Sequence, residues 1–237
     1  MPTLVLLRHG QSQWNLENRF TGWVDVDLTA EGEAQARKGG ELIAKAGLDI
    51  DQAFTSVQTR AIRTCNLALD AAKQSFVPVT KDWRLNERHY GGLTGLNKAE
   101  TAEKHGVEQV TIWRRSYDIP PPELAPGGEY DFAKDRRYKG ASLPSTESLA
   151  TTLVRVLPYW ESDIAPHLKA GETVLVAAHG NSLRAIVKHL FQVPDDKIVG
   201  VEIPTGNPLV IELDPQLKPT GARYLDESRA EALPQVG

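Results

Sequence analysis

Two short apolar runs that each end in a histidine and a glycine constrain the fold of this chain more than any other feature. LVLLRHG covers residues 4–10, and VLVAAHG covers residues 174–180. Neither run has the polar alternation of a strand with one face in water, so both are expected to be strands buried on both faces. Such strands occur mainly in parallel sheets that helices cover on both sides. The two runs therefore favour an α/β fold.

The rest of the chain supports this interpretation, because strand and helix patterns alternate along most of it. Thr29 is a candidate helix N-cap, and the helical pattern from Ser145 to Ile164 is expected to bend at Pro158. Short strands are expected at residues 4–7, 52–56, 77–80, 174–178 and 209–213. This order predicts a three-layer α/β sandwich, with a mostly parallel central sheet and helices on both faces. Ligands of such sheets bind beyond the carboxyl ends of the strands, so His9 and His179 should lie at the same edge.

The domain organisation predicted from the sequence is a single domain spanning residues 1–237. Strand and helix alternation breaks down at about residues 82–140, which are interpreted as an insertion. Its proline- and glycine-rich part, Pro120 to Gly128, is typical of a lid over a site. The tail, residues 226–237, is polar and is expected to be frayed.

Composition excludes several classes of protein. The formal net charge of -4 provides no overall positive field to recruit nucleic acid or an anionic membrane. The single cysteine, Cys65, lies in an apolar helical stripe and is expected in the core. Arg8 interrupts the first apolar run after four residues, which does not fit a signal peptide, and no run is long enough to span a bilayer. A cytoplasmic protein is expected.

The residues at the two strand ends predict a site for a phosphoryl group. Gly10 and Gly180 follow the two histidines, and each precedes a probable helix start, where free N–H groups favour an anion. Arg8 and Arg60 add guanidinium groups at the same edge. One histidine can act as nucleophile and form a phosphoenzyme. The other histidine and the arginines can then neutralise the transferring group.

The same chemistry needs a proton donor, and Glu87 in RLNERHYGGLTG is the candidate. His89, two residues later, is equally compatible with packing and with support of this site, whereas the remaining three histidines are interpreted as structural. Zinc is the rival use of two histidines and a glutamate, but no zinc-binding motif supports it. WRR, residues 113–115, fits either a solvated helix end or a clamp for a substrate anion.

Seven motifs together identify a family. They are LRHGQSQWN, NRFTGW, TSVQTRAIRT, LNERHYGGLTGLNKAETAEKHG, WRRSYD, AHGNSLRAIVKHL and IPTGNPLV. The chain resembles, over nearly its whole length, the phosphoglycerate mutases that depend on 2,3-bisphosphoglycerate, within the histidine phosphatase superfamily. RHG alone indicates only the superfamily, whereas the NERHYGGLTGLNKAETA block and WRR are much more specific to the mutases.

The resemblance implies a role for each matching residue. His9 would be the phosphorylated nucleophile, Glu87 the proton donor and acceptor, and His179 a stabiliser of the transferring phosphoryl group. The phosphate pocket would be lined by Arg8, Asn15, Arg60 and Gly180. The carboxylate and second phosphate of the substrate would be bound by Thr21, Gly22, Arg88, Tyr90, Lys98, Arg114, Arg115 and Asn181. The primer of the phosphoenzyme would be 2,3-bisphosphoglycerate, and no metal would be needed.

The activity implied is the interconversion of 3-phosphoglycerate and 2-phosphoglycerate in glycolysis and gluconeogenesis. The alternatives are a broad-specificity histidine phosphatase and a non-catalytic module that binds phosphorylated ligands. Relatives form homo-oligomers, so a dimer or tetramer is expected. Two features depart from the family: Gln11 stands where many members have glutamate, and the tail after Asp226 is short. The short tail leaves its part in closing the site open.

Overall fold

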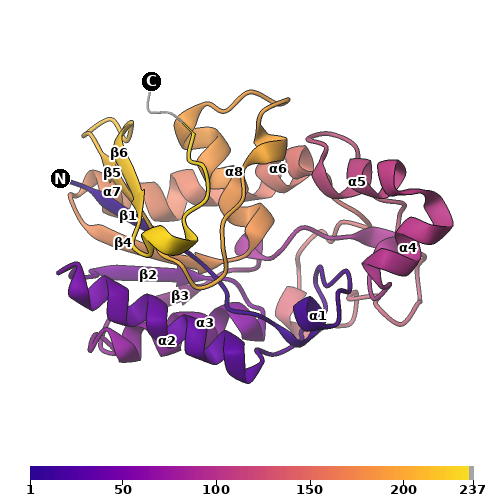
Figure 1. Ribbon diagram of the computed structural model, residues 1–237, viewed down its shortest axis with the longest axis horizontal. Coiled ribbons are helices and arrows are strands. Elements are labelled where there is room, and N and C mark those ends of the chain that lie inside the picture. Colours follow the sequence, from indigo (N-terminus) through magenta and orange to yellow (C-terminus); the bar gives the residue numbers. More distant parts are fainter. Residues whose placement is uncertain (235–237) are drawn as a thin grey trace.

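The computed structural model describes residues 1–234 and builds them around a six-stranded sheet (Figure 1). The strands are β1 (Thr3–Arg8), β2 (Gln52–Thr55), β3 (Val79–Lys81), β4 (Thr173–Ala178), β5 (Leu209–Leu213) and β6 (Pro219–Tyr224). Their order is β3-β2-β4-β1-β5-β6, in which the first four are parallel, β5 is antiparallel to β1, and β6 is antiparallel to β5. The predicted mostly parallel α/β sheet is confirmed. The edge strand β6 was not anticipated.

Helices cover both faces of this sheet (Figure 1). One face carries α2 (Ala30–Lys45) and α3 (Thr59–Ala71), and the other carries α6 (Leu149–Tyr159), α7 (Ala165–Lys169) and α8 (Gly180–Phe191). Thr29 caps α2 as predicted, since its hydroxyl accepts a hydrogen bond from Gly32 N. Pro158 lies inside α6, and a π-helical turn, Trp160–Ile164, follows before α7 begins. The expected irregularity thus falls just beyond the proline that removes a backbone donor.

The strands divide their side chains between two cores. In β1, Leu4 and Leu6 pack with α6 and α8, whereas Val5 and Leu7 pack with α2 and α3. This alternation explains why the strand is an unbroken apolar run, because both of its faces are covered. Cys65 belongs to the second core, and burial raises the pKa of its thiol to about 12. It is therefore a core residue, as expected.

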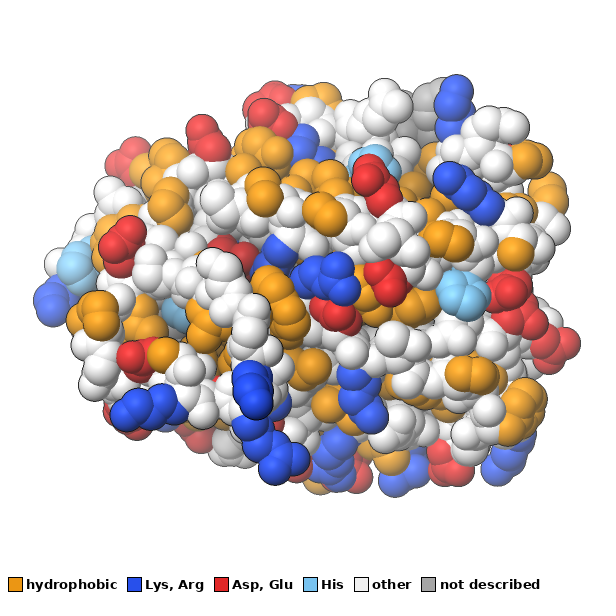
Figure 2. Space-filling model, turned by 180° about the vertical axis from the view of Figure 1, so that it is seen from behind, with side chains coloured by type: hydrophobic (Ala, Val, Ile, Leu, Met, Phe, Trp, Pro, Cys, Tyr) orange, Lys and Arg blue, Asp and Glu red, His pale blue; other side chains and the backbone are white. Residues whose placement is uncertain are grey.

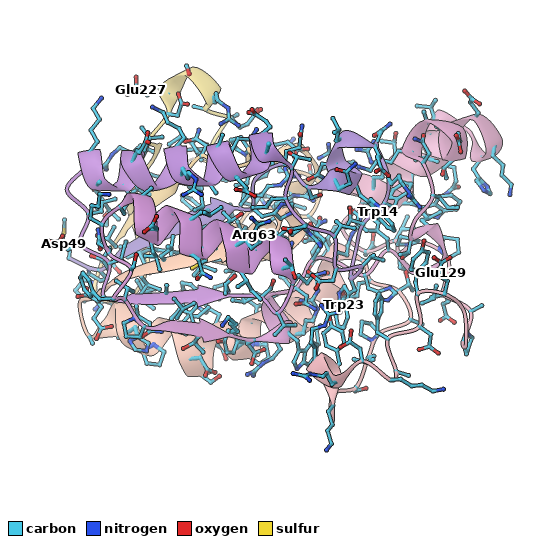
Figure 3. The ribbon with its side chains drawn as sticks, turned by 90° about the horizontal axis from the view of Figure 1, so that it is seen from below. Trp14, Trp23, Asp49, Arg63, Glu129 and Glu227 are labelled. Carbon is cyan, nitrogen blue, oxygen red and sulfur yellow. The ribbon has the colours of Figure 1, made fainter. Side chains whose placement is uncertain are left out.

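A segment between β3 and α6, residues 82–148, lies beyond the carboxyl ends of the strands, where Figure 1 shows it beside α1 (Gln13–Leu16). It contains α4 (Lys98–His105) and α5 (Val107–Arg115), with 3₁₀ turns at Trp83–Leu85, Gly91–Leu93 and Arg136–Tyr138. It packs on two tryptophans of the N-terminal part, which are labelled in Figure 3. The Trp23 ring lies 4.8 Å from that of Tyr138, and the Trp14 ring lies 6.0 Å from that of Tyr130. These contacts hold the segment over the strand ends.

The tail differs from the expectation in its first part. Residues Glu227–Arg229 form a 3₁₀ turn, like Ile198–Gly200 earlier in the chain. Asn207 Nδ2 donates to the carbonyls of Asp226 and Arg229, at 3.0 and 3.2 Å. The prediction of a frayed end from Asp226 is therefore wrong for these residues, because a buried asparagine ties them to the segment before β5. The last part of the predicted tail, residues 235–237, lies outside the described residues.

On the face seen in Figure 2, basic and acidic side chains are interspersed with apolar ones. Within residues 1–234, no helix combines the length and the apolar character needed to cross a membrane.

Candidate active site

The register of β1 and β4 brings the two strand-end histidines together. Arg8 is paired with Ala178 across the parallel ladder, and His9 N donates to Ala178 O at 2.9 Å. A histidine directly follows the last residue of each strand, and the centroids of the His9 and His179 rings are 5.0 Å apart. Both side chains are buried, at 3% and 0% exposure. The prediction that these imidazoles meet at one edge of the sheet is confirmed.

A backbone carbonyl decides which nitrogen of His9 is available. His9 Nδ1 lies 2.7 Å from Gly10 O, and a carbonyl can only accept, so Nδ1 must carry the proton. The lone pair is then on Nε2. Burial and the nearby Arg60 and Arg8 lower the pKa of His9 well below 6.5. The ring is therefore neutral at pH 7, which is the state required of a nucleophile.

His179 is held in the same Nδ1–H tautomer by a different partner. Its Nε2 lies 2.8 Å from Ser56 Oγ, and that oxygen already accepts a hydrogen bond from Gln58 N. The Ser56 hydroxyl has no other acceptor among the described residues, so it donates to Nε2, which leaves the ring proton on Nδ1. This Nδ1 is buried without a partner among the described residues. Burial, Arg60 and His9 lower the pKa of His179, so the ring is neutral. Its Nδ1–H is therefore a buried donor that lacks an acceptor among the described residues.

Two arginines complete the strand-end pocket, which we define as Arg8, His9, Arg60 and His179. Arg60 lies in the first turn of α3 and donates to Val24 O and Gly22 O, at 2.9 and 2.8 Å. Burial lowers its pKa to about 10, so it remains charged at pH 7. Arg8 donates through Nη1 to a backbone carbonyl, but its buried Nε has no partner within residues 1–234. The pocket therefore presents unused donors and positive charge to an anion.

Close packing of two main chains explains why position 10 is glycine. A Cβ on Gly10 would lie 2.0 Å from Gly32 O, and a Cβ on Gly32 would lie 2.0 Å from Gln11 O. The loop after β1 therefore crosses the first turn of α2 backbone to backbone. Because a Cβ cannot be placed at either position without moving a main chain, this crossing fixes the path of the chain just after His9.

Glu87 enters the site from the inserted segment, and its main chain is firmly held. Its N–H donates to Gln58 Oε1 at 2.9 Å. Its carbonyl accepts from Trp23 Nε1 at 2.6 Å and from Arg155 Nη2 at 2.9 Å. The carboxylate accepts hydrogen bonds from the neighbouring Asn181. The segment that carries Glu87 is thus tied to the N-terminal part, to α3 and to α6.

A cavity joins these groups to further cations. It is lined by Arg8, His9, Asn15, Arg19, Thr21, Gly22, Arg60, Glu87, Tyr90, Lys98, Arg114, Arg115, Gly180, Asn181, Arg184 and Glu202. Seven of these side chains are Lys or Arg and two are Glu, so the wall is strongly positive. In residues 1–234, no group of three His, Cys, Asp or Glu side chains is arranged to hold a metal ion.

Three of the cations come from the inserted segment and form what we call the outer cation group: Lys98, Arg114 and Arg115. Lys98 begins α4, and the two arginines end α5. Burial and then Arg114 lower the pKa of Arg115, and burial is also the largest cause lowering the pKa of Lys98. Like charges are therefore held close together, and an anion among them would relieve the repulsion.

Two of the predicted site residues do not reach the cavity wall. His179 is fully buried next to His9, and Arg88 is fully buried as well. The Arg88 guanidinium lies over the Tyr90 ring and donates to the carbonyls of Trp113 and Arg114, each at 3.1 Å. It therefore caps the end of α5 and supports the two arginines of the outer cation group that end this helix, Arg114 and Arg115.

Sequence reasoning missed three residues of the wall: Arg19, Arg184 and Glu202. Helical spacing could have identified Arg184, because it lies three positions after Asn181 on the same helix. Glu202 lies directly before the IPTGNPLV motif, to which no site role was assigned from the sequence. His89 is buried among aromatic rings and accepts from Gly91 N at 3.0 Å. Its ring therefore supports the loop beside Glu87.

Comparison with known proteins agrees with this geometry. The family model of the histidine phosphatase superfamily (branch 1) matches residues 4–221. A 2,3-bisphosphoglycerate-dependent phosphoglycerate mutase of Caulobacter vibrioides (strain NA1000 / CB15N) is 94% identical over 237 residues, which cover 100% of both chains. The protein of the same name from Hyphomonas neptunium is 65% identical over 236 residues, also 100% of each chain.

Among solved structures, a mycobacterial glucosyl-3-phosphoglycerate phosphatase in complex with VO3 is 22% identical, with a TM-score of 0.71. The match covers 94% of this chain and 97% of the phosphatase, and at this identity it shows the fold alone. The full-length relatives are far more similar in sequence. This chain belongs to the histidine phosphatase superfamily and, within it, to the 2,3-bisphosphoglycerate-dependent phosphoglycerate mutases.

Proposed function

We propose that this chain interconverts 3-phosphoglycerate and 2-phosphoglycerate through a phosphohistidine at His9. One observation carries the proposal. A neutral His9, anchored through Nδ1, lies 5.0 Å from His179 in a cavity that also holds Glu87 and the outer cation group. Chemistry on one phosphate needs only the strand-end pocket, whereas a substrate with a second anionic group also needs the outer cations.

His9 takes the phosphoryl group on Nε2, so that a P–N bond forms as a P–O bond breaks. The buried orphan donors Arg8 Nε and His179 Nδ1 fit a phosphoryl oxygen, and with Arg60 they would neutralise charge on the equatorial oxygens. When bound, 2,3-bisphosphoglycerate supplies the phosphoryl group that first loads His9. The cavity fits 2,3-bisphosphoglycerate and the monophosphoglycerates, which carry several negative charges, because positive charge dominates its wall.

Glu87 moves the proton that balances each transfer. When phospho-His9 gives its group to a substrate hydroxyl, the P–N bond breaks, an O–P bond forms and Glu87 accepts the hydroxyl proton. In the reverse sense, His9 takes the phosphoryl group from the other carbon, and Glu87 returns the proton to the leaving alkoxide. No net proton is consumed, and the result is isomerisation.

The outer cation group selects the substrate and holds it while its two phosphates exchange places. Lys98, Arg114 and Arg115 line the same cavity as His9 and would bind the carboxylate and the phosphate that is not being transferred. Asn15, Thr21, Gly22 and Tyr90 also line the wall and would complete this binding surface. Arg88 would act indirectly, through the end of α5.

Exclusion of water is the remaining requirement, because water that reached phospho-His9 would turn the mutase into a phosphatase. The inserted segment covers the site, and Pro122 O accepts a hydrogen bond from Gly92 N at 2.7 Å, close to Glu87 in the chain. We propose that the stretch Pro120 to Gly128 limits the access of water. The broad phosphatase alternative lacks a use for the outer cation group.

One assay tests the function. The purified chain is incubated with 3-phosphoglycerate and a trace of 2,3-bisphosphoglycerate in the presence of a chelator. Formation of 2-phosphoglycerate supports the proposal and its metal-free chemistry. Free phosphate as the main product would favour the phosphatase, and absence of turnover would favour a binding module. A dimer or tetramer and a cytoplasmic location stay predictions, and sedimentation velocity tests the assembly.

A further inference from the structure

Arg184 is a buried arginine that the proposed mechanism does not use. It lies on α8, is 4% exposed and borders the cavity. Its Nη1 donates to Asn181 Oδ1 at 2.9 Å, and its Nη2 donates to Ile198 O at 2.5 Å. Two groups from different parts of the chain, one on α8 and one in the 3₁₀ turn that follows it, are thus joined by a single guanidinium.

This contact fixes the orientation of the Asn181 amide. An arginine side chain can only donate, so the atom of Asn181 that faces it must be the carbonyl oxygen. The amide nitrogen then has to face the other way, where Nδ2 donates to Glu87 Oε1 at 2.9 Å and lies 3.4 Å from the Tyr90 hydroxyl. If the amide turned over, its oxygen would face the carboxylate, and two acceptors would repel each other.

The oriented amide makes the two carboxylate oxygens of Glu87 unequal. Oε1 accepts three hydrogen bonds, from Arg88 N at 2.7 Å, Asn181 N at 3.2 Å and Asn181 Nδ2 at 2.9 Å. No described residue donates a hydrogen bond to Oε2. That oxygen is directed towards Gly180 and Arg8, since a Cβ on Gly180 would lie 3.8 Å from Oε2 and 3.5 Å from Arg8 Cζ.

We propose that Arg184 is a positioning residue for proton transfer in the mutase reaction. Through Asn181 it keeps Oε1 of Glu87 occupied and reserves Oε2 as the oxygen that exchanges the proton with the substrate hydroxyl. The backbone carbonyl of Ile198 holds the guanidinium in place. This inference rests on the proposed function, and it adds a residue that acts on Glu87 without touching the reacting atoms.

The first experiment removes the donors but keeps the bulk of the side chain. R184M should lower kcat for 3-phosphoglycerate by about ten- to a hundredfold, because a misplaced catalytic group costs that much, while KM changes by less than about threefold. The matched control is K188M on the same helix, whose Lys188 also donates to a backbone carbonyl of the following loop, at 2.6 Å. K188M should keep kcat within about twofold.

A double-mutant cycle separates positioning from a general structural effect. If Arg184 acts through Asn181, N181A and the double variant N181A/R184M should have the same kcat within about twofold. Multiplicative losses in the double variant would overturn the proposal, as would an R184M enzyme with the kcat of the wild type. An inactive wild-type chain would instead contradict the proposed function itself.

R184K is a conservative variant that distinguishes loss of the hydrogen bond from loss of folding. Urea unfolding of every variant checks that each one is folded. Lysine keeps one donor for Asn181 Oδ1, although it cannot also reach Ile198 O in the same fork geometry. R184K should therefore retain at least about three times the kcat of R184M, by keeping a charged hydrogen bond to the amide. Equal losses in the two variants would contradict an effect through Asn181.

Discussion

The strand-end pocket and the outer cation group hold their charges in different ways. Arg60 and His179 are almost fully buried, and both are fixed by hydrogen bonds to other residues. Arg114 and Arg115 are half-buried at the end of a nine-residue helix in the inserted segment. Chemistry therefore depends on groups set by sheet register, whereas substrate choice depends on groups that an inserted segment presents.

This difference teaches how one fold can serve several reactions. A pocket built on paired strands leaves little freedom to its side chains, so it preserves the phosphoryl chemistry. A cation group on short helices can change with the segment that carries it, without disturbing the sheet. If the two regions are separable, substitutions in one should change different measurements from substitutions in the other.

The strand-end pocket should fail completely when its nucleophile is removed. His9→Ala should lower kcat by at least about 10⁴-fold, because no other residue of the described cavity wall offers an unprotonated nitrogen, and Nε2 of His179 is already bonded to Ser56. The measurement is turnover of 3-phosphoglycerate together with an acid-labile, alkali-stable phosphoryl label on the protein. His105→Ala, at the exposed end of α4, is the control and should keep both. Label retained in His9→Ala would refute the assignment.

The close crossing between the loop after β1 and α2, next to the strand-end pocket, should affect the free energy of unfolding. Gly32→Ala places a Cβ 2.0 Å from Gln11 O, so we expect a loss of about 2–3 kcal/mol in the free energy of unfolding from overpacking. The direction is informative, since alanine normally stabilises a helix interior relative to glycine. Urea unfolding measures the effect, with Lys38→Ala, on the same helix, as a near-neutral control. A more stable Gly32→Ala variant would show that this crossing tolerates a shift.

The outer cation group should affect substrate binding and leave the phosphoryl site intact. Arg114→Met should raise KM for 3-phosphoglycerate by about ten- to a hundredfold, because a charged hydrogen-bond donor to the substrate is lost. Competitive inhibition by vanadate should change by less than about threefold, since a small anion needs only the strand-end pocket. Lys104→Met on α4 is the control. Equal losses for both ligands would mean that the two regions are not separable.

The support beneath the inserted segment should respond to pH. Burial lowers the pKa of His89 from 6.5 to about 4, so between these values the unfolded chain binds a proton that the native chain does not. Stability from this group is complete above pH 6.5 and falls as the pH falls, by about 1.4 kcal/mol per pH unit.

His89→Asn keeps an acceptor for Gly91 N but cannot titrate. Its unfolding free energy should therefore depend less steeply on pH by about that amount, as measured by urea unfolding from pH 7 to pH 5. Parallel profiles for the two proteins would show that His89 is protonated in the native state.

The smallest expected effect concerns water. Deleting residues 125–128 removes part of the proposed cover but spares Pro122, whose carbonyl is bonded to Gly92 N. The ratio of phosphate release to isomerisation should rise by about three- to tenfold, because phospho-His9 becomes more accessible to solvent. An unchanged ratio would assign this stretch no part in excluding water.

Much of the fold could be predicted because its signals are local. Buried parallel strands are apolar throughout, and the strand predicted at residues 174–178 coincides with β4 except for its first residue. The strand β6 escaped prediction because its sequence, PTGARY, has no apolar pattern, and it is held by antiparallel pairing with β5 at the edge of the sheet. The ordered first part of the tail was not predicted for a related reason, since its hydrogen bonds come from Asn207, which is distant in the sequence.

The candidate site divides in the same way. Residues in recognisable motifs, such as Lys98 and Arg115, could be placed by resemblance, and the structure brings both to the cavity. Arg88 was expected at the wall but does not line the cavity, because its guanidinium donates to carbonyls at the end of α5. Glu202, which contacts Arg115, lies directly before the IPTGNPLV motif, to which no site role was assigned, and its place in the wall depends on the packing of the loop before β5.

By itself, the sequence determined that two imidazoles would meet at one edge of a buried sheet, because the carboxyl ends of parallel strands share an edge. Only the tertiary structure decided which nitrogen of His9 is free, which proton His179 keeps and which oxygen of Glu87 is left for the substrate. Those choices depend on particular hydrogen-bond partners. Ser56, which fixes His179, and Asn181, which occupies Oε1 of Glu87, come from segments far away along the chain, whose positions only packing fixes.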